Sequence, residues 1–252
     1  MKNVLKALFR MLGLEVRRSG TPAVQPQVAR TKRDEDSMEA GMSRAKKMHG
    51  VEPSAIIDLG AAAGSWTEKA CTFWPDAYFL LMEPLEERKE ELSALAAAHP
   101  KFRTVFAAAG DRVGKVKFVV AGDLDGSGVY DAESTGGDRE VELTTIDHEV
   151  ERLGLAGPFV IKFDTHGFEI PILEGARETL KKTDLIIMEC YGFRIAANCL
   201  LFPEMCIHME KLGFRLSDVI HPVRRPGDGM FWQCDAFFLR KDHPAFAKNT
   251  FA

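Results

Sequence analysis

Short apolar runs alternate with helix-like segments along the first half of the chain. The runs have the length of buried strands and end in turn residues, and the segments between them favour helices. The predicted strands are 55–60, 78–83 and 102–108, and the predicted helices between them are 65–73 and 84–98. Regular alternation of this kind favours a parallel sheet whose strands are joined by crossover helices.

The pattern changes after the third strand. Two further strands follow with no helix between them, and a glycine-rich connection joins them, which predicts an inserted β-hairpin with its loop near the active site. Strand and helix then resume, and the chain ends in two strands that we expect to pair antiparallel. These later elements are strands 115–120 and 140–145, helix 147–154, strands 159–163 and 184–189, helix 203–212, and strands 214–220 and 235–240.

The first 33 residues differ from the rest of the chain. Residues 2–17 predict an amphipathic helix with a basic side, and 18–33 predict a linker with glycine and proline. A helix over 34–49 then leads into the main domain, so we expect two parts, 1–33 and 34–252. A basic amphipathic helix can contact a membrane surface or a partner. It can equally pack on its own domain or on a second copy in a homo-oligomer.

Composition and charge indicate the class of protein, its partners and its compartment. Of 252 residues, 46% are hydrophobic and 28% charged, as in soluble globular proteins. Residues 1–33 carry eight Lys and Arg and one acid, whereas the remainder carries 25 and 36, so we expect no nucleic-acid partner. Five cysteines without a C-x-x-C pair indicate free thiols in the cytoplasm. No run reaches the ~18–20 apolar residues of a membrane span, and the N-terminus lacks a convincing signal-peptide cleavage site.

The turn after the first strand carries the first candidate binding motif. Asp58-Leu59-Gly60 ends the strand, and Gly64 precedes the next helix, which is where open α/β sheets bind ligands. Glu83 ends the second strand 23 residues after Gly60, close to the ~20-residue offset of a ribose-binding acid. Ala62 breaks the G-x-G-x-x-G fingerprint, so a nucleoside without pyrophosphate, such as S-adenosylmethionine, fits better than a nicotinamide dinucleotide. An ordinary strand–turn–helix stays the alternative.

A second motif follows strand 159–163. Lys162 and Asp164 lie two residues apart and so point to the same face of the strand. Because buried charges seldom persist unpaired, this pair at a strand end suggests a site. His166 follows in the turn, Gly167 opens a helix, and Glu169 stands in its first turn.

The segment from Lys162 to Ala176 is similar to the K-x-D-x-x-G-x-E-x-x-x-L-x-G-A signature of the FkbM family of methyltransferases. The resemblance extends over about 54–240 and implies a Rossmann-like class I methyltransferase fold. That fold has a mostly parallel central sheet, an antiparallel C-terminal strand, an inserted β-hairpin and helices on both faces. Thr165 and His166 depart from the small, acidic or amide pair that often precedes the glycine in this family.

The resemblance implies an S-adenosylmethionine-dependent O-methyltransferase acting on a hydroxyl of a sugar, glycan, glycolipid or secondary metabolite. Asp164 is the expected base or acceptor-orienting residue, with His166 as its rival. Alternatives stay open for each: Asp164 can simply brace the site with Lys162, Glu169 can serve the helix terminus, His166 can be a surface turn residue, and Glu189 can cap a helix. The full expected set is Asp164, His166, Lys162, Glu169 and Glu189 for catalysis, and Asp58, Gly60, Ala61, Gly64, Trp66, Glu83, Ala108, Gly110, Asp111 and Ser127 for the donor.

Three alternatives to this function are kept. The acceptor can be a nitrogen or a protein, or the domain can be a non-catalytic module that docks through its basic helix.

No metal site is predicted, because Asp164, His166 and Glu169 match no strong zinc spacing, although magnesium is left open. Arg224, Arg225 and Trp232 would suit a sugar or an anionic acceptor.

Overall fold

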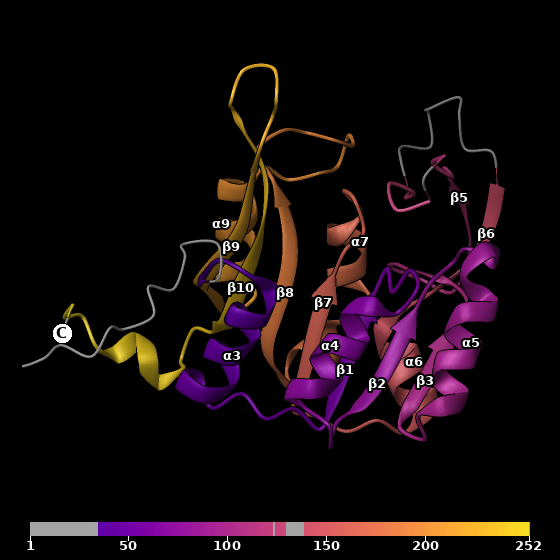
Figure 1. Cartoon of the computed structure of the whole chain (residues 1–252), viewed down its shortest axis with the longest axis horizontal. Helices are drawn as coiled ribbons and strands as arrows, with labels where there is room; N and C mark the ends of the chain where they lie inside the picture. Colours follow the sequence, from indigo (N-terminus) through magenta and orange to yellow (C-terminus); the bar gives the residue numbers. More distant parts are fainter. Residues whose placement is uncertain (1–34, 123, 130–138, 252) are drawn as a thin grey trace, which may run out of the picture. The chain divides into compact units, whose positions relative to one another are not determined.

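The computed structural model describes residues 35–122, 124–129 and 139–251 (Figure 1). The predicted helix 2–17 and the linker 18–33 lie outside the described residues. Among the described residues, no helix has both the length and the apolar character that a membrane crossing requires.

A seven-stranded sheet in the order β3-β2-β1-β7-β8-β10-β9 forms the centre of the domain (Figure 1). The first five strands in this order run parallel, β10 is antiparallel to β8, and β9 is antiparallel to β10. The strands are β1 (Ala55–Leu59), β2 (Tyr78–Met82), β3 (Phe102–Val105), β7 (Phe159–Phe163), β8 (Thr183–Tyr191), β9 (Phe214–Arg224) and β10 (Phe231–Arg240). The mostly parallel sheet with an antiparallel C-terminal strand is confirmed.

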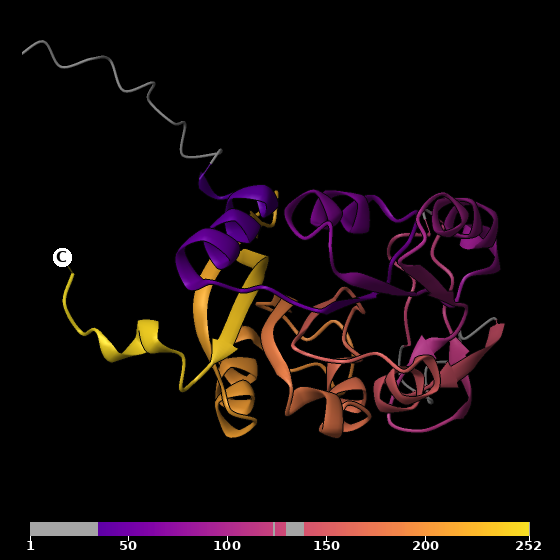
Figure 2. The same cartoon turned by 90° about the horizontal axis from the view of Figure 1, so that it is seen from below.

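Helices cover both faces of this sheet (Figure 2). Alternate residues of β1 therefore enter two cores: Ile56 packs with the helices of one face, and Ile57 with those of the other. This is why β1 and β7 are buried along their whole length and are apolar except at Asp58 and Lys162. One face carries α3 (Met38–His49), α4 (Ser65–Phe73) and α5 (Lys89–Ala98), and the other carries α6 (Ile146–Leu153), α7 (Glu169–Glu174), α8 (Arg177–Leu180) and α9 (Phe202–Lys211).

The insertion between β3 and β7 forms a second, three-stranded sheet. β5 (Gly114–Phe118) and β6 (Arg139–Thr144) pair antiparallel, as the predicted hairpin requires. The prediction of one strand over 102–108 is wrong, because β3 ends at Val105 and Ala108–Ala109 form β4. β4 belongs to the second sheet, where it pairs parallel with Leu143 and Thr144 of β6.

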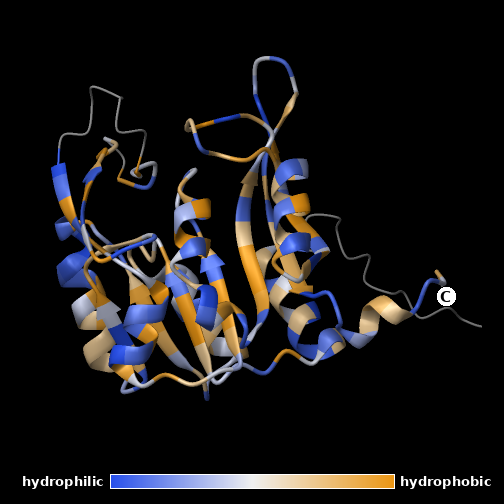
Figure 3. Cartoon of the chain, turned by 180° about the vertical axis from the view of Figure 1, so that it is seen from behind, coloured by the Kyte–Doolittle hydropathy of each residue, from blue (hydrophilic) through white to orange (hydrophobic). Residues whose placement is uncertain are grey.

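The remaining differences have local causes. The helix predicted over 84–98 opens with a 3-10 turn, η1 (Glu86–Arg88), after Pro84. β9 extends to Arg224 through Pro222, which an edge strand tolerates because it needs no N–H toward a further neighbour. A second 3-10 turn, η2 (Pro244–Ala247), follows β10. Figure 3 shows the resulting distribution of hydropathy, with hydrophobic segments along the central strands and a mixture of hydrophobic and hydrophilic residues on the helices around them.

Candidate active site

A cavity of about 430 Å³ lies at the carboxyl ends of β1, β2 and β7. The turn after β1 contributes Gly60 to its wall, the end of β2 contributes Glu83, and the turn after β7 contributes Asp164 and His166. The insertion adds further wall residues, Ser127 among them. The two sequence motifs therefore meet in one cavity, although about a hundred residues separate them.

The turn after β1 takes its shape from two glycines. Gly60 has φ +70° and Gly64 has φ +85°, a left-handed conformation that glycine adopts without steric cost. The N–H groups of Gly60 and Ala61 both donate to the carbonyl oxygen of Met82. A Cβ on Gly64 would lie 2.3 Å from the Leu95 side chain, so this glycine also lets α5 approach.

Glu83 ties the turn to the second strand. Its carboxylate accepts hydrogen bonds from the backbone N–H of Ala62 and of Leu85, both at 2.9 Å. Burial raises the pKa of Glu83, although these two hydrogen bonds and the charge of Arg88 act in the opposite direction. Glu83 thus lines the cavity and at the same time braces the turn that forms the cavity wall.

A buried lysine joins the ends of β1 and β7. The Nζ atom of Lys162 lies 2.8 Å from Asp164 Oδ2 and 3.6 Å from Asp58 Oδ1. Asp58 is fully buried, and its Oδ2 accepts a hydrogen bond from Thr67 at 2.7 Å. Burial raises the pKa of Asp58 despite the neighbouring lysine. Burial alone would lower the pKa of Lys162, but the charges of Asp164 and Asp58 raise it.

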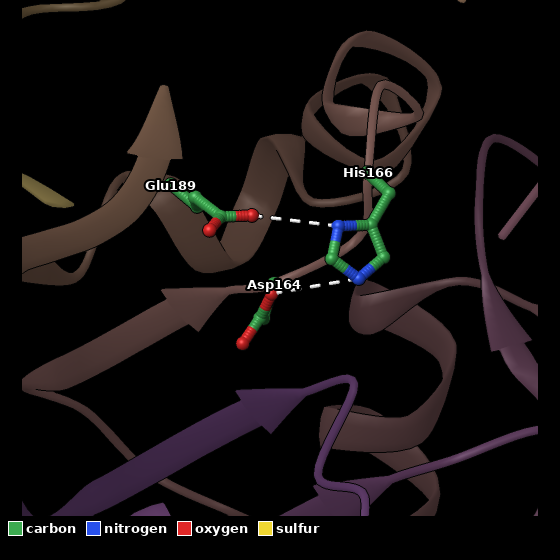
Figure 4. A group of neighbouring side chains, drawn as sticks. All are labelled: Asp164, His166 and Glu189. Carbon is green, nitrogen blue, oxygen red and sulfur yellow. Dashed lines mark ion pairs between the residues drawn. The ribbon is translucent and has the colours of Figure 1, made fainter. Parts of the chain in front are cut away.

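His166 lies between two carboxylates (Figure 4). Its Nδ1 is 3.4 Å from Glu189 Oε2, and its Nε2 is 3.8 Å from Asp164 Oδ1. Nε2 also lies 2.6 Å from the carbonyl oxygen of Asp125, and Nδ1 lies 2.9 Å from the Tyr191 hydroxyl. Burial alone would lower the pKa of His166, but the interaction with Glu189 and the charge of Asp164 raise it to about 9.

Two further side chains, Tyr191 and Gln233, bind the Glu189 carboxylate. The Tyr191 hydroxyl donates to its Oε2, and the Gln233 side-chain amide donates to its Oε1. Sequence reasoning missed both partners. Tyr191 stands two residues after Glu189 on β8 and so shares its face, a signal that the sequence did contain. Gln233 comes from β10 and carries no such local signal.

The predicted site residues fall into two groups. Those at the cavity wall are Gly60, Glu83, Ala108, Ser127, Asp164 and His166. The others lie behind the wall or away from it: Asp58, Ala61, Gly64, Trp66, Gly110, Asp111, Lys162, Glu169 and Glu189.

Two members of the second group have other partners. The Oε1 atom of Glu169 accepts from the Gly167 N–H at 2.8 Å and from the Thr165 hydroxyl at 3.2 Å, so Glu169 stabilises the turn before α7. Asp111 is exposed and pairs with the neighbouring Arg112 at 2.9 Å. Wall residues that the sequence did not single out include Arg88, Asp125 and Phe168.

The sequence and the fold both resemble known proteins. The sequence matches the methyltransferase FkbM domain over residues 58–216, which includes both motifs and more than half of the chain. The chain belongs to the FkbM family of methyltransferases. It therefore carries a methyltransferase domain that uses S-adenosylmethionine.

Solved structures resemble this FkbM chain only distantly. Methyltransferase FkbM from Methylobacillus flagellatus KT matches with 14% identity and a TM-score of 0.49, over 73% of this chain and 43% of that one. This chain therefore spans less than half of that protein's length. Burkholderia thailandensis 1,6-didemethyltoxoflavin-N1-methyltransferase has 12% identity, coverage of 82% and 80%, and a TM-score of 0.46. Aeropyrum pernix fibrillarin has 11% identity, coverage of 79% and 72%, and a TM-score of 0.46. Comparison with curated proteins gives no match.

The cavity of this FkbM domain fits S-adenosylmethionine. Its volume of about 430 Å³ lies within the range of small-molecule sites. Gly60 and Ala62 keep the wall beside β1 free of large side chains, and Glu83 places a carboxylate at the end of β2 for ribose hydroxyls. Leu85 and Phe118 add apolar surface against which a purine ring can pack.

Proposed function

We propose that the protein methylates a hydroxyl group of a sugar, glycan, glycolipid or secondary metabolite. One observation carries this proposal: Asp164 and His166 line the same cavity as Gly60 and Glu83. The first pair offers a carboxylate and an imidazole, which are the side chains suited to receive a hydroxyl proton. The second pair belongs to the donor side, so donor and acceptor would meet in one enclosed space.

Different side chains bind the methyl donor and act on the acceptor. When bound, S-adenosylmethionine supplies an electrophilic methyl group, and the electron pair of the broken C–S bond stays on sulfur. Glu83 binds the ribose hydroxyls, and the Gly60 turn leaves room for the amino-acid part. Asp164 and His166 orient the acceptor hydroxyl, and the Asp164 carboxylate receives its proton as the new O–C bond forms, because a pKa of about 9 keeps the His166 ring protonated near neutral pH. Lys162 holds the Asp164 carboxylate in place through its hydrogen bond to Oδ2.

Donor binding is the first experiment. Isothermal titration calorimetry with S-adenosylmethionine and S-adenosylhomocysteine compares the wild type with Glu83→Gln, and with Glu86→Gln as a matched exposed control. Loss of charge-assisted hydrogen bonds worth about 1.5–3 kcal/mol predicts about 10–100-fold weaker binding for Glu83→Gln. Glu86→Gln is expected to bind like the wild type. Folded wild-type protein that binds neither ligand would favour the non-catalytic module.

Acceptor class is the second experiment. Donor labelled in the methyl group is incubated with sugars, glycolipids, hydroxylated metabolites, amines and peptides. We expect label on a hydroxyl, and about 10²–10⁴-fold slower transfer in Asp164→Asn and His166→Gln at unchanged S-adenosylhomocysteine affinity. Label only on nitrogen would overturn the proposal of a hydroxyl acceptor. Three predictions from the sequence lie outside these experiments. They are a contact of residues 2–17 with a membrane or partner, a homo-oligomer, and a cytoplasmic location.

A further inference from the structure

Asp164, His166 and Glu189 bring three metal-ligating groups together (Figure 4). One potential ligand atom from each lies within 4.8 Å of those of the other two, and within the described ranges no other such group occurs. Asp164 and His166 follow β7, and Glu189 stands near the end of the adjacent strand β8. We propose that these three side chains bind one divalent ion of the first transition row at the acceptor side of the cavity.

The partners of His166 favour this role. A carbonyl oxygen can only accept a hydrogen bond, so the 2.6 Å contact with Asp125 places a proton on Nε2. Nδ1 then faces Glu189 Oε2 at 3.4 Å, and a metal bound there would displace the proton that the raised pKa of His166 keeps on the ring. Metal-ligating histidines commonly donate their other N–H to a backbone carbonyl in this way, because it fixes the tautomer and the ring orientation.

The two carboxylates are held in the same manner. Lys162 donates to Asp164 Oδ2 at 2.8 Å, which leaves Oδ1 without that bond and 3.8 Å from Nε2 of His166. Gln233 donates to Glu189 Oε1, which leaves Oε2 on the side of the imidazole. The Tyr191 hydroxyl, bound to Oε2 here, would become a neighbour of the ion. Each proposed ligand thus has an outer partner that orients it, as metal sites require.

Geometry and charge also fit a dication. Ligand distances of about 2.0–2.2 Å give separations of about 3.0–3.6 Å between adjacent ligand atoms. The Nδ1–Oε2 distance of 3.4 Å already lies in that range. Lys162 supplies one positive charge to the three carboxylates of Asp58, Asp164 and Glu189, and a dication would balance the other two. One imidazole with two carboxylates suits Mn²⁺, Fe²⁺ or Zn²⁺ better than the all-oxygen preference of Mg²⁺ or Ca²⁺.

The sequence predicted no metal here because it grouped Asp164 and His166 with Glu169. The structure directs Glu169 to the Gly167 N–H and supplies Glu189 from the neighbouring strand instead. Asp164 and His166 line the cavity, so open coordination positions would face the acceptor. There the ion would orient a hydroxyl and lower its pKa. That role rests on the proposed function, whereas binding of the ion does not.

Manganese binding by the full chain tests the proposal. Chelator-treated protein is titrated with MnCl₂ and followed by electron paramagnetic resonance and calorimetry. We expect one ion per chain, at least about tenfold weaker binding in Glu189→Gln, and a similar loss in Asp164→Asn. Glu174→Gln, an exposed residue of α7, is the matched control and is expected to bind like the wild type. Retained S-adenosylhomocysteine affinity shows that the variants are folded.

The outcomes separate this inference from the proposed function. Wild-type protein that binds no Mn²⁺, or Glu189→Gln that binds it equally well, overturns the metal site. If chelator-treated protein binds no Mn²⁺ and still methylates a hydroxyl at full rate, the metal site is refuted and the proposed function is not. Mn²⁺ binding that depends on Glu189, without methylation of any hydroxyl, would refute the proposed function alone.

Discussion

Gly60 lies against the backbone of Asp164 so closely that a Cβ on Gly60 would be 2.1 Å from the Asp164 carbonyl oxygen. The Asp164 N–H also donates to the carbonyl of Leu59 at 3.2 Å. The turn after β1 and the turn after β7, which carries Asp164 and His166, are therefore in direct backbone contact. A backbone shift in either turn would therefore meet the backbone of the other directly.

Gly60→Ala is expected to destabilise the protein and to weaken donor binding. The positive φ of +70° costs an alanine about 1 kcal/mol, and the contact with Asp164 forces the backbone to move as well. We expect a total loss of more than about 2 kcal/mol in urea unfolding. Gly50→Ala is the control, because Gly50 has φ +65° with nothing within 4 Å of the added Cβ. Equal losses in the two variants would show that the Asp164 contact is unimportant.

Lys162→Met tests the buried charge network. It removes the cation between Asp58 and Asp164 and leaves Asp58 fully buried without its ion pair. Breaking a buried pair of this kind costs about 3–5 kcal/mol, measurable by denaturant unfolding. Combining it with Asp58→Asn should restore part of the loss, because the unpaired charge is gone. A double variant as unstable as the sum of the single ones would contradict this coupling.

Glu87 provides a prediction on pH. The hydrogen bonds from Arg139 lower the pKa of this exposed carboxyl from 4.5 to about 2. Because the folded pKa is lowered, the stabilisation is complete above the unfolded pKa and is lost as pH falls toward about 2. Carboxyl titration by NMR should find the low value in the wild type and an ordinary one in Arg139→Ala. High salt should weaken the effect at this exposed pair.

Cysteine reactivity gives a further prediction. Burial raises the pKa of Cys234 to about 12 and that of Cys190 well above its usual value. Because the thiolate is the reactive form, iodoacetamide at pH near 8 should leave both unmodified in the native protein. Cys71 and Cys206 are partly exposed and should react first, as mass spectrometry of the labelled peptides would show. Labelling of Cys234 as fast as Cys71 would indicate local opening around β10.

Local pattern predicts most of the sheet, because its strands are short apolar runs with clear ends. It fails between Val105 and Ala108, where the extended chain continues but leaves the large sheet for the small one. The difference depends on pairing with Leu143 and Thr144, which lie more than 30 residues later. Apolar periodicity reports burial and carries no information about the pairing partner, so this division cannot be predicted from the local sequence.

In the candidate site, too, local sequence predicts the residues at the strand ends but not their partners on other strands. The sequence indicates Glu83, Asp164 and His166 because each stands at or just after a strand end within one of the two motifs. The contact between His166 and Glu189 depends on how β7 and β8 pair, with Phe163 opposite Met188. The motif predicts a catalytic role for Glu169, whose carboxylate accepts the Gly167 N–H, a partner that the sequence did not indicate. Spacing along the chain predicts which strand end a side chain occupies and leaves its partners open.

The position of Gln233 has a consequence for synthesis of the protein. Gln233 lies on β10, which follows the other six strands of the large sheet in sequence, yet β10 inserts between β8 and β9, and the Gln233 amide binds Glu189. A nascent chain can fold the donor side from β1 and β2 long before this amide has left the ribosome. The side of the cavity with Glu189 is completed only after β10 has emerged, so a translation product that ends before Gln233 would lack this contact.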